Sequence, residues 1–146
     1  MTEERMPDPE ELEPFRFERL TPRFPVSDVG AMVAFYRDVL GFEIDVRWPE
    51  EEPTFVIVQR DEARVAFFTN ERVGTGGHGG VELYIDVPDA QALHDELAQR
   101  VAIAWGPEVY SYGCREFAVL DPEGYMVIFT EATQDAPTTE EPVAPE

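Results

Sequence analysis

The spacing of apolar residues changes several times along the chain, and each change marks a predicted element. From Val29 to Leu40 apolar residues recur every three or four positions, which predicts an amphipathic helix. Asp28 stands where an N-cap is expected, and Gly41 follows the helix where a positive φ is favoured. A second helix is predicted through Arg100 on the same grounds, with Asp89 as its N-cap.

The segments around these helices alternate between apolar and polar residues, which predicts strands. Arg19–Val26 contains two prolines and suits an edge strand. The turn Asp-Pro-Glu-Gly at 121–124 predicts a hairpin. The other predicted strands are Phe42–Trp48, Thr54–Gln59, Arg64–Thr69, Val81–Val87, Val109–Tyr112, Arg115–Leu120 and Tyr125–Thr130.

These elements repeat once along the chain at an offset of about 61 residues. Phe24–Asp28 aligns with Ile85–Asp89, and Phe67–Asn70 aligns with Ile128–Glu131. Each module reads strand, helix, strand, strand, strand. The sequence therefore predicts an α+β fold of two pseudo-symmetric βαβββ modules, with a cleft between their sheets.

Both ends of the chain are acidic and carry prolines without a sustained apolar period. Residues 1–17 are predicted as an acidic N-terminal tail and residues 134–146 as a disordered acidic C-terminal tail. The folded domain is predicted over residues 18–133, with modules at 18–73 and 80–133 joined by the Gly-rich link Glu71–Gly80.

Charge and cysteine usage narrow the classes of partner. The formal net charge of -20 disfavours nucleic acid, because a phosphate backbone requires a basic surface, and it also disfavours anionic membranes. No segment predicts a membrane span or a signal peptide. The single cysteine, Cys114, forms no intramolecular disulfide, and a cytoplasmic location is expected. The acidity is interpreted as solubility or salt adaptation, or as attraction for a cationic ligand.

Two longer motifs carry a family resemblance. The run VSDVGAMVAFYRDVLGF, Val26–Phe42, resembles the opening of the vicinal oxygen chelate superfamily, and YGCREFAVLDPEG, Tyr112–Gly124, resembles its closing hairpin. The phrase Tyr-Gly-x-Arg-Glu-Phe and the strand Val81–Ile85 are similar to the bleomycin-resistance branch. The resemblance covers residues 18–132. It implies a cup-shaped half-barrel from each module and a homodimer, in some members with an exchanged first strand.

The resemblance also implies where the metal ligands of the family would stand, namely at Thr21, Phe67, Glu82 and Ile128. Only Glu82 offers a good donor, whereas a catalytic divalent ion needs about three protein ligands. We therefore expect vestigial positions with no metal and no other cofactor. A shift of one or two residues in the alignment would instead bring in Glu18, Asp86 or Glu131.

Without a metal, the remaining feature is a cavity lined by aromatic side chains. Trp48 and Trp105 stand beside prolines near strand ends, which predicts positions on the rim. Arg115 and Glu116 are adjacent on a strand, so one of them should face the cavity. Phe35, Phe42, Phe68 and Phe129 are assigned to the core. The predicted ligand-binding residues are Trp48, Phe55, Phe67, Glu82, Trp105, Tyr110, Tyr112, Arg115 and Phe117.

These features favour a metal-free protein that binds and sequesters a small molecule. The resemblance implies a cationic, aromatic antibiotic of the bleomycin type, since flat cations stack on aromatic rings and gain from nearby carboxylates. The alternative is a metal-dependent glyoxalase-like lyase or ring-cleaving dioxygenase with displaced ligands. A third interpretation is an interaction module without a ligand. The sequence shows no nucleophile with an evident base, so binding is favoured over catalysis.

Overall fold

The computed structural model of the chain describes residues 16–69 and 81–139. The predicted Gly-rich link and most of both predicted tails lie outside these residues. Within them, no helix is long and apolar enough to span a membrane.

Ten elements form two modules with the same order. The first module contains β1 (Arg23–Pro25), α1 (Val29–Asp38), β2 (Glu43–Trp48), β3 (Phe55–Arg60) and β4 (Ala63–Phe68). The second contains β5 (Glu82–Asp86), α2 (Ala90–Leu97), β6 (Trp105–Tyr110), β7 (Cys114–Leu120) and β8 (Met126–Ala132).

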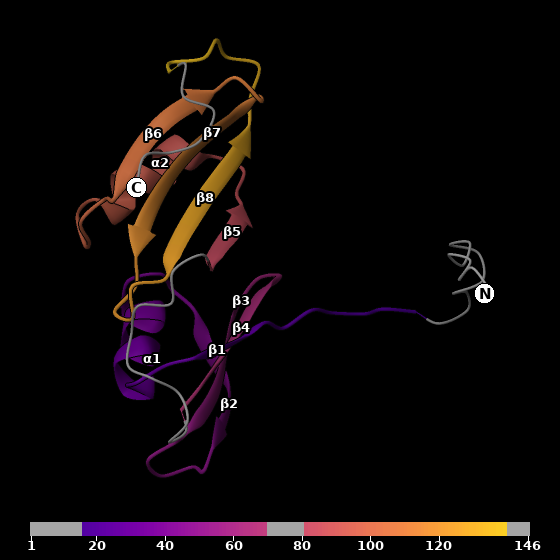
Figure 1. Ribbon diagram of the computed structural model, residues 1–146, viewed down its shortest axis with the longest axis vertical. Coiled ribbons are helices and arrows are strands. Elements are labelled where there is room, and N and C mark those ends of the chain that lie inside the picture. Colours follow the sequence, from indigo (N-terminus) through magenta and orange to yellow (C-terminus); the bar gives the residue numbers. More distant parts are fainter. Residues whose placement is uncertain (1–15, 70–80, 140–146) are drawn as a thin grey trace, which may run out of the picture.

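Each module builds one four-stranded sheet, in the orders β1-β4-β3-β2 and β5-β8-β7-β6. The first strand of each module pairs in parallel with the last, and the other pairs are antiparallel. Neither sheet closes on itself, and α2 lies behind β6, β7 and β8 in the view of Figure 1. The predicted α+β class and the two βαβββ modules are confirmed.

The predicted helix starts are confirmed in atomic detail. The Asp28 carboxylate accepts from the Ala31 N–H at 3.0 Å, and Asp89 accepts from the Ala92 N–H at the same distance. These bonds satisfy donors that the first helical turn leaves without a partner. Both helices end two or three residues earlier than the apolar pattern predicts, at Asp38 and Leu97.

Each helix covers one face of its sheet, and strand alternation decides which side chains it buries. In the first sheet α1 covers Phe24, Val56, Val58, Val65 and Phe67. In the second sheet α2 covers Phe117, Val119, Val127 and Phe129. The side chains in between point to the opposite side, which we call the helix-free face of each sheet.

The register of the last strands corrects the sequence alignment. Phe24 pairs with Phe67 in the first sheet, whereas Ile85 pairs with Phe129 in the second. The second module is therefore one residue longer between its first and last strands. A slip of one residue moves a side chain to the other face of a sheet. The counterpart of Ile128 is thus Ala66, and Phe67 corresponds to Phe129 beneath the helix.

A buried polar cluster joins the two modules at the predicted hairpin turn. The Tyr36 hydroxyl donates to the Asp121 carboxylate at 3.0 Å. The Glu123 carboxylate accepts from the Ser27 N–H at 2.7 Å and from its hydroxyl at 2.6 Å. The Tyr125 hydroxyl donates to a backbone carbonyl of β1 at 2.8 Å. Carboxylates rarely sit in a core without such partners, so these bonds fix how the modules meet.

The buried carboxyl of Asp121 should leave a pH signature in stability. Burial raises the pKa of Asp121 above its ordinary value. The folded state holds this proton more tightly than the unfolded state. The contribution of Asp121 to the free energy of unfolding is therefore fully present below its ordinary pKa, and it is lost as pH rises through the raised pKa of the folded state. Asp121→Asn should flatten this dependence, measured as the free energy of unfolding in urea between about pH 4 and 7. Asp61→Asn, on an exposed turn, is the control, and parallel curves for wild type and Asp121→Asn would contradict the assignment.

Candidate ligand-binding site

The helix-free face of the second sheet brings together polar and aromatic side chains from three strands. Trp105 lies opposite Ala118, which lies opposite Ile128. One step along the strands, Glu108 lies opposite Glu116, and Glu116 lies opposite Thr130. Because cross-strand pairs place their side chains about 5 Å apart, each row forms a continuous strip.

Three predicted aromatic residues form a chain of contacts on this face. The rings of Trp105 and Tyr110 meet edge to face with centroids 6.3 Å apart. The rings of Tyr110 and Tyr112 are parallel within 2° at 5.4 Å. Tyr112 is 48% exposed, and the Trp105 indole N–H points to the Met126 sulfur at 3.3 Å. The structure thus supplies one exposed ring, Tyr112, backed by two fixed ones.

Glu116 lies at the end of this aromatic chain and is only 2% exposed. The Tyr112 hydroxyl donates to its Oε1 at 2.6 Å. Its Oε2 makes no hydrogen bond within the described part of the chain, and the same holds for the buried Tyr110 hydroxyl and Thr130 hydroxyl. Burial raises the pKa of Glu116, and the neighbouring Thr130 hydroxyl partly opposes this rise. Buried polar atoms without partners cost about 1–3 kcal/mol each, so three on one face point to a function.

The predicted set did not include Glu116. The adjacency of Arg115 and Glu116 left open which of them faces the cavity, and Arg115 was included. Phe117 supplies the missing signal, because its burial beneath α2 places Glu116 on the opposite face and Arg115 on the same side as Phe117.

Three of the predicted residues lie on the helix sides instead. Arg115 pairs with Glu131 at 3.9 Å and with Asp135. Phe117 meets the His94 ring of α2 edge to face at 5.4 Å. Phe67 is fully buried against Tyr36 of α1, with centroids 4.8 Å apart. Strand alternation thus directs all three side chains away from the helix-free faces.

The helix-free face of the first sheet is more basic. Trp48, Phe55 and Phe68 occupy one row, and Trp48 is 66% exposed at the end of β2. The Arg23 guanidinium lies 5.4 Å from the Phe55 ring centre and 4.8 Å from that of Phe68. Phe68 is therefore a partly buried residue of this face, where the sequence predicted core. Arginine over aromatic rings gives this face a stacking surface.

The donors at the predicted metal positions are poor. The Thr21 hydroxyl accepts from Arg64 at 3.1 Å, and Ala66, which replaces Phe67 by register, has no donor atom. Glu82 is exposed on β5, and Ile128 is apolar. Of the alternative ligands from a shifted alignment, Glu131 already forms an ion pair with Arg115 and accepts a hydrogen bond from the Ala90 N–H. Within residues 16–69 and 81–139, no three His, Cys, Asp or Glu side chains gather closely enough to hold a metal ion.

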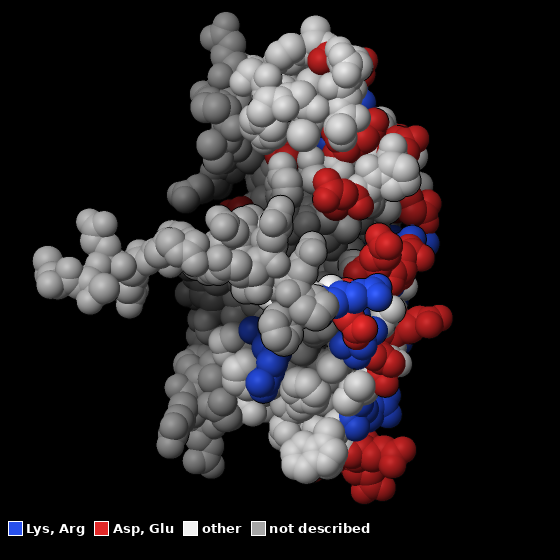
Figure 2. Space-filling view, turned by 90° about the vertical axis from the view of Figure 1, so that its right-hand side faces the viewer, with Lys and Arg blue, Asp and Glu red and all other residues white. Residues whose placement is uncertain are grey.

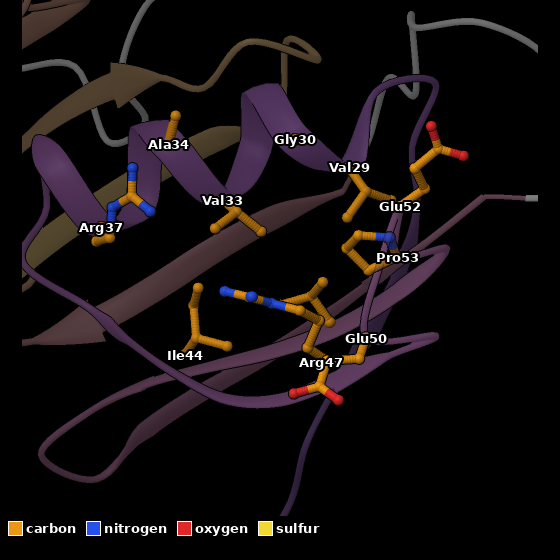
Figure 3. A pocket seen from close by; sticks show the side chains of 11 residues that line it. Val29, Gly30, Val33, Ala34, Arg37, Ile44, Arg47, Glu50, Glu52 and Pro53 are labelled. Carbon is orange, nitrogen blue, oxygen red and sulfur yellow. The ribbon is translucent and has the colours of Figure 1, made fainter.

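Two hollows lie elsewhere on the molecule. One, of about 340 Å³, lies between α1 and β2, where Arg37 and Arg47 border an apolar floor (Figure 3). A second, of about 860 Å³, lies between the β3–β4 turn and the β5–α2 region, with four acidic residues among its lining. None of the predicted ligand-binding residues lines either hollow. We place more weight on the helix-free faces, because in the described part of the chain the buried side-chain atoms without partners belong to strand residues of these faces and to none of the residues that line the hollows.

Figure 2 shows acidic side chains along one border of the molecule, with arginine side chains among them. On the second sheet, Glu82, Asp86, Glu108 and Glu116 all belong to rows of the helix-free face. This face therefore favours a cation or a group rich in N–H donors.

Comparison with known proteins places this arrangement in a family. The model of the Glyoxalase/Bleomycin resistance protein/Dioxygenase superfamily matches residues 17–129. The bleomycin-binding protein of Streptomyces verticillus, solved with copper(II)-bleomycin, is 30% identical with a TM-score of 0.62; the match covers 82% of this chain and 98% of that one. No curated protein matches the chain significantly.

Two further structures show the same fold at lower identity. A glyoxalase/bleomycin resistance protein/dioxygenase from Nocardioides is 14% identical, with a TM-score of 0.69 and coverage of 90% of this chain and 95% of that one. TnmS3, an antibiotic binding protein from Streptomyces sp. CB03234, is 22% identical, with a TM-score of 0.64 and coverage of 81% and 98%. With the family model matching most of the folded part, the chain belongs to the glyoxalase/bleomycin resistance protein/dioxygenase superfamily.

Proposed function

We propose that this protein binds and sequesters a small molecule, and that its ligand is a cationic, aromatic antibiotic of the bleomycin type. The observation that carries the proposal is the second sheet's helix-free face, where the Trp105–Tyr110–Tyr112 chain ends on the buried Glu116 carboxyl. Flat cations stack on aromatic rings and gain from a nearby carboxylate. Retention of a ligand requires only such a preformed surface with a few polar anchors.

The 30% identical bleomycin-binding protein supports this proposal, because its structure contains copper(II)-bleomycin and this chain covers 98% of its length. The poor donor set at Thr21, Ala66, Glu82 and Ile128 favours binding over metal-dependent lyase or dioxygenase chemistry. Sequestration accounts for the aromatic and acidic side chains without a catalytic step.

The proposed functional unit is a homodimer. Phe17 is 90% exposed and Leu20 is 84% exposed on an extended segment that projects from the first module (Figure 1). The helix-free faces also expose Trp48, Tyr84 and Tyr112. A second copy would cover this apolar surface, and the projecting segment suits an arm that crosses to the partner. In this arrangement the first sheet of one copy faces the second sheet of the other, and the ligand lies between them.

The aromatic and electrostatic contributions to binding should be separable. Trp48→Ala and Trp105→Ala should each weaken the binding of metal-free bleomycin by about 1 kcal/mol or more, which is about fivefold in Kd. Glu82→Gln keeps the shape of the side chain and removes its charge. It should therefore weaken the binding of the glycopeptide at low salt, and much less at higher salt, where charges are screened over about 10 Å. Calorimetric titration measures all three variants, with Glu62→Gln on the turn between β3 and β4 as the charge-matched control. Equal affinity of every variant and wild type would refute the proposed groove.

The dimer is tested separately by light scattering. At micromolar concentration the mass should be twice the 16.6 kDa of one chain. Leu20→Glu should shift the equilibrium toward monomer, because a charge at an apolar contact opposes its burial. A monomeric wild type would remove the shared groove.

Metal addition distinguishes binding from the enzymatic alternative. Zinc, nickel, manganese or iron should raise the Tm of the protein no more than chelator does, because three of the four family positions carry Thr, Ala and Ile. One tightly bound ion per chain, lost in Glu82→Ala, would favour the metal-dependent enzyme instead.

A further inference from the structure

Three buried oxygen atoms on the helix-free face of the second sheet have no hydrogen-bond partner within residues 16–69 and 81–139: Glu116 Oε2, Thr130 Oγ1 and Tyr110 Oη. We infer that they form a subsite for a protonated primary amine of the ligand. The inference rests on the proposed function and deepens it, since it names the group that the site recognises. It also assigns a role to Glu116 and Thr130, which the sequence did not single out as ligand-binding residues.

The register places the three side chains together. Glu116 of β7 and Thr130 of β8 are direct cross-strand partners, so their side chains stand side by side on one face. Tyr110 of β6 pairs with Cys114, one step along the same face from Glu116. The Tyr112 ring stacks on the Tyr110 ring, and the Tyr112 hydroxyl donates a hydrogen bond to Glu116 Oε1 at 2.6 Å. Oε1 is thereby occupied, whereas Oε2 has no such partner among the described residues.

The balance of donors and acceptors selects the ligand group. A carboxylate only accepts hydrogen bonds, and the two hydroxyls accept as well as donate. An ammonium group carries three N–H donors and no acceptor, which matches three acceptor oxygens in number and kind. A water molecule can also bond all three oxygens, because the hydroxyls can donate to it, but it brings no positive charge to the buried carboxylate. Hydrogen bonds between charged groups are also stronger than neutral ones.

The charges around the three oxygens point the same way. Glu108 lies opposite Glu116, and Asp86 lies opposite Thr130, so both neighbours in the row are acidic. The nearest arginine in sequence, Arg115, pairs with Glu131 and Asp135 on the helix side. An anionic ligand would therefore meet like charge here, whereas a cation would offset the burial of the carboxylate.

A structural role and a ligand-binding role for Glu116 predict different stabilities for Glu116→Gln without ligand. If Glu116 served stability, Glu116→Gln would destabilise the protein without ligand. If it serves a ligand, the unliganded protein holds a buried carboxyl with an unused oxygen, and removing the charge leaves its stability unchanged or higher. The two roles are thus distinguished by stability and affinity measured together.

The experiment compares 2-naphthylmethylammonium with neutral 2-naphthylmethanol, because the shared naphthalene ring stacks equally on Tyr112. NMR titration of wild-type protein should show tighter binding of the ammonium. Glu116→Gln should lower the affinity for the ammonium on the order of tenfold or more and should leave the affinity for the alcohol within about twofold of wild type. Thr130→Val should weaken the ammonium several-fold, and Glu62→Gln should have no effect. The Tm of Glu116→Gln should equal or exceed that of wild type.

A titration with metal-free bleomycin separates this inference from the proposed function. If bleomycin binds wild type and Glu116→Gln equally, the function stands and the subsite is overturned. If the ammonium binds in a Glu116-dependent way and bleomycin does not bind, the subsite stands and the bleomycin-type function is overturned. Equal affinity for ammonium and alcohol, no binding of the ammonium, or a destabilised Glu116→Gln with unchanged affinity would each overturn the subsite.

Discussion

Each helix of this protein packs on one face of its sheet only, and this constraint shapes the rest of the molecule. Side chains alternate along a strand, so burying Phe24, Phe67, Phe117 and Phe129 under helices commits their neighbours to the other face. Those neighbours include Phe68, Glu116 and Ile128. A sheet with one face covered by a helix leaves its second face for a ligand or a second copy of the chain.

The polar cluster between the modules explains why the two sheets keep a fixed relation. Tyr36, Ser27 and Tyr125 bond across sequence separations of 85, 96 and 100 residues, to Asp121, Glu123 and the β1 backbone respectively. Carboxylates in such a position are stable only with geometrically matched donors, so the cluster admits few alternative packings. The covered faces of both sheets thereby merge into one core, while the helix-free faces differ in charge.

That difference in charge is a second consequence of the same alternation. The first sheet presents Arg23 over Phe55 and Phe68, and the second presents Glu116 beside Thr130. In the proposed dimer, facing sheets of this kind would complement each other and would contact opposite ends of a ligand that carries both a cation and an acceptor group. Complementary charge of this sort sets orientation more than affinity.

Much of the fold could be predicted from the sequence, because its signals are local. Asp28 and Asp89 cap the helices, and the modules repeat. The site was harder to predict because it depends on register. A single offset for the whole repeat misses one extra residue in the second module and puts Phe67 in the place of Ala66. Strand alternation also puts Glu116 and Arg115 on opposite faces of the sheet. The packing of Phe117 under α2 shows that Glu116 is the one on the helix-free face.

The proposed function requires that a ligand lie between the helix-free face of the first sheet and that of the second sheet. The two tryptophans report on it directly, since Trp48 belongs to the first sheet and Trp105 to the second. Two-dimensional ¹H–¹⁵N NMR resolves both indole N–H signals during titration with metal-free bleomycin. The proposed function predicts that both signals shift along one saturable curve. Shifts confined to residues beside α1 and α2, with both indole signals unmoved, would contradict it.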